Sequence, residues 1–97
     1  DGATISVDAS LSNNFTITLG GNRTLANPTN LRNGGVYTFV IVQDGTGSRT
    51  LSYGSKFKWP GATPPTLSTG AGSVDFIVAQ YYAAGDILLC NCLKGFG

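Results

Sequence analysis

The stretch Gln43–Gly54, which reads QDGTGSRTLSYG, combines residue types that often bind anions: Gly45 and Gly47 lie two residues apart, and Arg49 follows them. Glycine-rich loops hold phosphate when they connect a strand to a helix, because amides at the helix N-terminus face the anion. Here a second β-type run, SRTLSY, follows the loop, and no lysine takes the place used in phosphate-binding loops. The pattern therefore predicts a hairpin turn, with Arg49 free to pair with Asp44 or with another chain.

Catalytic arrangements that need histidine or glutamate are excluded, since the chain contains neither residue. This removes Ser-His-Asp and Cys-His sites. The carboxylates all come from aspartates, and these are Asp1, Asp8, Asp44, Asp75 and Asp86. We expect them to cap turns at strand ends, and the D-x-D-x-D-G pattern of calcium loops does not occur. We therefore expect no enzyme activity, no metal and no cofactor.

The two cysteines, Cys90 and Cys92, lie on the same face of a strand because they are two residues apart. Their Cα atoms would then be roughly 6.5–7 Å apart, at the limit of what a disulfide spans. We interpret both as small buried apolar residues. The alternative is an inter-chain cross-link through Cys90 and Cys92. A metal site is disfavoured, since no histidine or second cysteine pair completes a ligand set.

The aromatic stretch SYGSKFKWPGATPP places Tyr53, Phe57 and Trp59 beside Lys56 and Lys58. Sugar-binding sites often stack a sugar face on such rings, so these three aromatic residues are the candidates for contact with a glycan or another partner. The competing interpretation is that Trp59 fills the core of a small β-domain, with the chain turning at the Pro-Gly that follows it.

β-type runs alternate with turn signals along the whole chain. The segment Ser73–Ala84 also fits helical spacing, but its β-branched and aromatic residues favour a strand that forms a hairpin with Ile87–Lys94. The other predicted strands are Thr4–Asp8, Asn14–Leu19, Arg23–Asn27, Val36–Gln43, Ser48–Tyr53 and a short one within Lys56–Trp59. Together they predict an all-β domain over residues 1–97, a small antiparallel, jelly-roll-like β-sandwich or a barrel of about seven or eight short strands.

The run Val36–Gln43 is apolar on both faces, so both faces must be covered. In a chain of 97 residues this predicts a central strand, or a strand whose second face meets another subunit. We therefore expect a homo-oligomer. The residues that we assign to the subunit contact are large and apolar: Tyr37, Phe39, Ile41 and Tyr82.

Composition sets further limits on the function. Only 11% of residues are charged and the net charge is +1, without the basic stripe that nucleic acids require. No apolar run is long enough for a membrane helix, and no signal peptide is visible. The chain starts without a methionine, so we expect the ordered or C-terminal part of a longer protein.

Three blocks, GNRTLANPTNL, QDGTGSRTLSYGSKFKWPG and PPTLSTGAGSVDF, occur in an order that resembles a module of bacteriophage virion proteins. These are structural proteins of the tail-fibre, head-fibre or capsid-decoration type, and the resemblance spans Phe15–Phe96. It implies a compact β-module that ends a longer virion protein or decorates a capsid, often as a trimer. The chain departs from the family pattern at Cys90 and Cys92, where aliphatic or small residues are usual, which bears on how copies are held together.

The sequence thus predicts a non-enzymatic virion structural protein that is built in the cytoplasm of the bacterial host. It would assemble through β-sandwich subunit contacts with its own copies and with other capsid or tail proteins, without nucleic acid and without membrane insertion. The alternative is a receptor-binding tip that recognises a host surface glycan. Exposed rings at Tyr53, Phe57 and Trp59 would favour the glycan, whereas buried rings together with an apolar strand face would favour assembly.

Overall fold

A computed structural model describes residues 4–96, which form eight strands and one short 3-10 turn, η1. The elements are β1 (Thr4–Ile5), β2 (Asn14–Leu19), β3 (Arg23–Leu25), β4 (Val36–Gln43), β5 (Leu51–Tyr53), β6 (Phe57–Lys58), η1 (Pro60–Ala62), β7 (Val74–Tyr82) and β8 (Ile87–Phe96). The all-β class and the expected number of short strands are confirmed. Asp1 lies outside the described residues.

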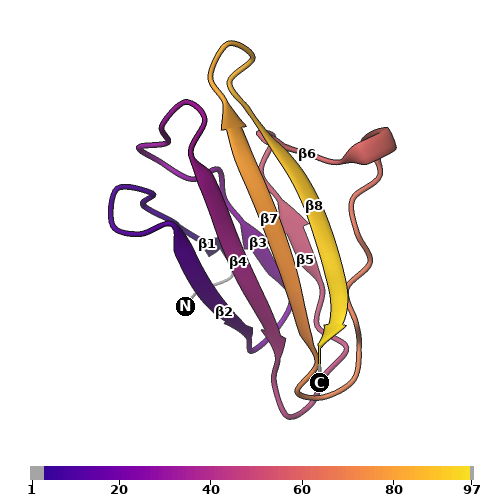
Figure 1. Ribbon diagram of the computed structural model, residues 1–97. Helices are drawn as coiled ribbons and strands as arrows, with labels where there is room; N and C mark the ends of the chain where they lie inside the picture. Colours follow the sequence, from indigo (N-terminus) through magenta and orange to yellow (C-terminus); the bar gives the residue numbers. More distant parts are fainter. Residues whose placement is uncertain (1–3, 97) are drawn as a thin grey trace.

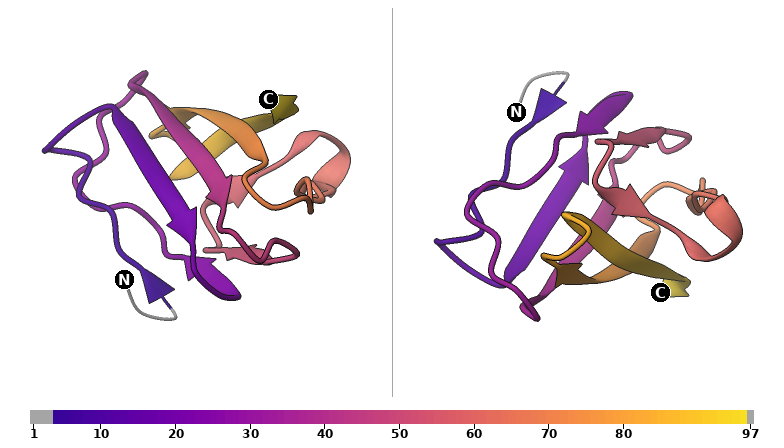
Figure 2. Two further views of the ribbon diagram at one scale, coloured as in Figure 1. Left: turned by 90° about the horizontal axis from the view of Figure 1, so that it is seen from below. Right: turned by 90° about the horizontal axis from the view of Figure 1, so that it is seen from above.

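The strands form two sheets that face each other. The smaller sheet has the order β1-β3-β5, and the larger has the order β2-β4-β7-β8-β6. The smaller sheet lies behind the larger one in Figure 1, and the end-on views of Figure 2 show it along one side of the curled five-stranded sheet. The larger sheet therefore has an inner face, toward the smaller sheet, and an outer face turned away from it.

The first half of the chain winds between the two sheets and pairs its strands in parallel. Thr4 is paired with Thr24 and Thr24 with Ser52 in the smaller sheet, and β2 runs parallel to β4 in the larger one. Parallel neighbours cannot be joined by a tight turn, so the chain crosses to the other sheet between them. The smaller sheet is consequently all parallel and the larger one is mixed, where the sequence predicted antiparallel pairing.

The same winding shows that the predicted hairpin at the loop from Asp44 to Ser48 is wrong. The loop leaves β4, which pairs with β2 and β7, and enters β5, which pairs with β3 in the other sheet. By contrast, the hairpin of β7 and β8 is confirmed, with the Asp86 N–H donating to the carbonyl of Ala83 at 3.1 Å in the turn. The strand interpretation of Ser73–Ala84 is confirmed with it.

The core lies between the sheets and is built by alternation along each strand. Phe39, Ile77 and Leu88, from three neighbouring strands, are fully buried. The ring of Phe15 stacks on that of Phe39 at 5.5 Å between centroids. The other buried apolar residues are Val7, Ala9, Ile17, Leu19, Leu25, Tyr37, Ile41, Phe57, Trp59, Leu67, Ala79 and Cys90.

Two buried polar side chains fasten the long segment that leads from η1 to β7. Asp75 accepts hydrogen bonds from the N–H of Ser68 at 2.7 Å and of Gly95 at 3.0 Å. The amide of Gln43 donates to the carbonyls of Ser68 and Arg49 and accepts from the N–H of Arg49. Buried backbone groups need hydrogen-bond partners, and these two side chains provide the partners that a neighbouring strand would otherwise supply.

Candidate functional site

The loop after β4 is organised by its own aspartate. One oxygen of Asp44 accepts the N–H of Thr46 at 3.0 Å and of Gly47 at 3.1 Å, and the other pairs with the Arg49 guanidinium at 3.0 Å. The hydrogen bond from Arg49, followed by that from the Gly47 N–H, lowers the pKa of Asp44. The amides that an anion would need are thus occupied by the chain's own carboxylate. The loop is a turn, as the absence of a following helix indicated.

Gly47 is the residue that this turn requires. Its φ of +75° lies in the left-handed region, and a Cβ there would lie 2.6 Å from the carbonyl oxygen of Thr69. The N–H of Ser48 donates to the same carbonyl at 2.8 Å. Gly45, which the sequence also marked, has open space around it. The turn therefore depends on Gly47 through close backbone packing.

The remaining described aspartates outside the core hold surface turns. Asp8 accepts from the Ser10 hydroxyl at 2.6 Å and from the Asn30 amide at 2.8 Å. Asp86 pairs with Lys56 at 2.9 Å and accepts from the Tyr81 hydroxyl at 2.5 Å. Among residues 4–96, no group of three or more His, Cys, Asp or Glu side chains is placed to hold a metal ion.

The aromatic candidates come together, but mainly as part of the core. The rings of Tyr53 and Trp59 meet edge to face with their centroids 4.8 Å apart, and the ring centroids of Tyr53 and Phe57 are 5.7 Å apart. Phe57 and Trp59 are only 5% and 8% exposed. Of the two interpretations weighed for Trp59, the core position is the one the structure shows.

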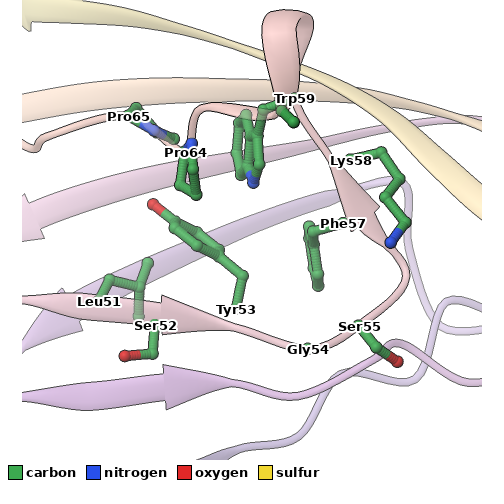
Figure 3. Close-up of a pocket in the computed structure, with 11 residues that line it drawn as sticks. Leu51, Ser52, Tyr53, Gly54, Ser55, Phe57, Lys58, Trp59, Pro64 and Pro65 are labelled. Carbon is green, nitrogen blue, oxygen red and sulfur yellow. The ribbon is translucent and has the colours of Figure 1, made fainter.

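A pocket of about 540 Å³ lies over these rings, between β5 and the proline-rich segment. Figure 3 shows the Tyr53 hydroxyl directed at Pro64 and Pro65. Within residues 4–96, this buried hydroxyl is without a hydrogen-bond partner, and burial raises the pKa of Tyr53. Because Phe57 and Trp59 are buried, these two rings offer little exposed surface on which a sugar could stack.

The outer face of the five-stranded sheet carries an extended apolar surface, which we call the outer apolar face. Its side chains project from β4, β7 and β8, the strands at the front of Figure 1, and are Val36, Val40, Val42, Val74, Phe76, Val78, Tyr82, Ile87, Leu89, Leu93 and Phe96. Tyr82, Leu89, Leu93 and Phe96 are each about half exposed. On β2, by contrast, the outward residues are polar: Asn14, Thr16 and Thr18.

The assignment of Tyr37, Phe39 and Ile41 to a subunit contact needs correction. These side chains are at most 2% exposed, because they point from β4 into the chain's own core. The opposite side of β4, with Val36, is the side that faces outward. Both faces of this strand are apolar, so the sequence could not tell which of them packs inside the chain. Tyr82 is half exposed on the outer apolar face and remains a candidate.

The two cysteines share the inner face of β8, as their spacing predicted. Cys90 is 4% exposed, and burial raises the pKa of its thiol to about 12. Cys92 is partly buried, and burial raises its pKa as well. Both thiols are free. A thiol in the position of Cys90 reaches another chain only if the strand moves.

Residues 4–96 contain no helix that is long and apolar enough to span a membrane. Comparison with known proteins found no match among curated proteins and none among solved structures. The model of the phage tail fibre C-terminal domain family, however, matches residues 3–86, which is most of the chain. The chain therefore belongs to the phage tail fibre C-terminal domain family and is a structural component of a phage virion.

Proposed function

We propose that this domain is a non-catalytic assembly module at the end of a tail fibre, and that its copies associate through the outer apolar face into a homotrimer. The observation that carries the proposal is the half exposure of Tyr82, Leu89, Leu93 and Phe96 on one continuous sheet surface. Tail location is favoured over capsid decoration, since the matched family is that of tail fibres.

The size of the outer apolar face supports a contact between proteins. Two half-exposed aromatic residues, Tyr82 and Phe96, leave on the order of 100 Å² each in water. With the aliphatic residues around them, the face reaches on the order of 500 Å², near the upper end of what monomers expose. A stable interface buries about 800 Å² on each partner. The face therefore supplies much of one side of such an interface.

The low charge of the chain suits association between identical copies. With a net charge of +1 and few charged residues, two copies approach with little electrostatic repulsion. The free thiols of Cys90 and Cys92 also fit assembly in the reducing cytoplasm of a host cell. Contacts would then hold the copies together by packing alone, without a cross-link.

The second candidate function is a receptor-binding tip that holds a host glycan in the pocket beside Tyr53. The pocket's volume favours it, and Ser52, Ser55 and Lys58 supply polar groups at the lining. The burial of Phe57 and Trp59 weighs against it, because stacking on a sugar needs an exposed ring face. Assembly is therefore the function that the geometry supports best.

Light scattering on the purified chain tests the assembly function. We expect Leu93→Asp to shift the mass toward the monomer, because it places a charge in the centre of an apolar contact. Thr24→Asp is the matched control: Thr24 is exposed on β3, in the other sheet, and its variant should keep the wild-type mass. Equal masses for both variants and the wild type would show that the outer apolar face is not part of the interface.

A further inference from the structure

Leu11, in the turn that precedes β2, is the most exposed large apolar residue among those described, at 80%. Its turn is held firmly. The N–H of Leu11 donates to the carbonyl of Asp8, the Asp8 carboxylate accepts from Ser10 and Asn30, and the Ser12 hydroxyl caps the start of β2. A rigid turn that presents one apolar side chain loses little conformational entropy when that side chain is buried by a partner.

A cavity of about 440 Å³ lies on the outer apolar face and matches such a side chain. Val36, Val78 and Leu89 form its apolar floor. Trp59 and Pro60, from the segment after β6, form a wall at the sheet edge, and Lys58 lies in the lining. The cavity is open to solvent, is mostly apolar, and has room for a leucine side chain.

The Leu11 side chain, which we call the knob, and the cavity lie at the same end of the five-stranded sheet but toward opposite edges. The amide of Asn13, two residues after Leu11, donates to the carbonyl of Val36 at 2.9 Å, and Val36 lies in the same cross-strand row as Gln80 and Leu89. In the sheet order, β2 is at one edge and β8 with β6 at the other. A rotation about an axis along the strands would bring the turn of one copy to the cavity of the next, and such a contact forms a ring when the rotation closes.

We propose that Leu11 of one copy inserts into the cavity beside Leu89 of the next copy, so that each outer apolar face is completed by a neighbour's turn. This inference rests on the assembly function proposed above and specifies which two surfaces meet in each contact. Charge agrees with it: Asp8, in the inserting turn, would approach Lys58 at the cavity. A second copy is therefore the occupant that the chain's own surface fits.

A mixing experiment tests this geometry. Leu11→Asp removes the knob and Leu89→Asp blocks the cavity, and both positions are exposed enough for the variants to fold. Each variant alone should be monomeric, with the dissociation constant raised roughly 10–100-fold per contact. Mixed in equal amounts, one intact knob and one intact cavity remain, so native mass spectrometry with one isotope-labelled chain should show heterodimers. Thr24→Asp should behave as wild type, and circular dichroism should show that every variant is folded.

The other outcomes are distinct. A Leu11→Asp variant that keeps the wild-type mass overturns the knob, and the assembly function survives if Leu93→Asp still dissociates. Two monomeric variants whose mixture stays monomeric overturn the pairing of Leu11 with the cavity beside Leu89. A monomeric wild type overturns the assembly function and this inference together.

Discussion

Replacing Asp75 by alanine should lower the free energy of unfolding more than a surface substitution does, because this side chain forms hydrogen bonds to two separate segments. Asp75 is 2% exposed, and its two oxygens accept the backbone N–H groups of Ser68 and Gly95. Hydrogen bonds to a charged group contribute about 1.5–3 kcal/mol each, and loss of the acceptor leaves two N–H groups unpaired. We expect Asp75→Ala to lower the free energy of unfolding by about 3–5 kcal/mol, against a total of about 5–15 kcal/mol for a domain.

Urea denaturation followed by Trp59 fluorescence measures this change. All samples are kept at one chain concentration, because association shifts apparent stability. Asp75→Asn should be intermediate, since the amide keeps one acceptor oxygen and turns a donor toward the second N–H. Ser52→Ala, at an exposed position on β5, is the control and should stay within about 0.5 kcal/mol of wild type. If Asp75→Ala lowered the free energy of unfolding by less than about 1 kcal/mol, the two hydrogen bonds of Asp75 would not have the stabilising role that we assign to them.

Three further predictions concern the turn, the pocket and pH. Gly47→Ala should lower the free energy of unfolding by about 2–4 kcal/mol through backbone strain and a clash, whereas Gly45→Ala should change it little; thermal melts distinguish them. Trp59→Ala should lower the free energy of unfolding by about 3–5 kcal/mol, because Trp59 is buried in the core. An unchanged melting temperature would instead favour an exposed ring that binds a glycan. The pKa of Asp44 lies below its ordinary value of 3.8, so its stabilisation is present above that pH and is lost as pH falls through the folded pKa. An NMR titration should show that pKa rising in Arg49→Ala, and no rise would contradict the pairing.

Much of the strand content could be predicted, because it depends on local patterns. Alternation and β-branched residues located β2 and β4, and they favoured a strand over a helix at β7. Partner choice could not be predicted in this way. A strand's own pattern is the same whether its neighbour is parallel or antiparallel, so the winding of β1 to β5 between two sheets was not visible.

The candidate site was predictable only where residue type determines the environment. The turn at Asp44 follows from its glycines and from the strand after it, and the shared face of Cys90 and Cys92 follows from their spacing. The expectation that Asp75 caps a turn was wrong, because this side chain is buried within β7, and Gln43 gave no signal. A polar residue in a strand usually marks the solvent side. The burial of these two side chains depends on unpaired backbone groups of a distant segment. Burial of one face of β4 rather than the other likewise depends on the second sheet.

The mass of the wild-type chain in solution tests the central claim most directly. The assembly function predicts a particle of three times the 10.0 kDa chain mass at micromolar concentration, by light scattering and by native mass spectrometry. It also predicts that Leu93→Asp reduces this mass while Thr24→Asp does not. A stable monomer at micromolar concentration would contradict the proposal that copies associate through the outer apolar face.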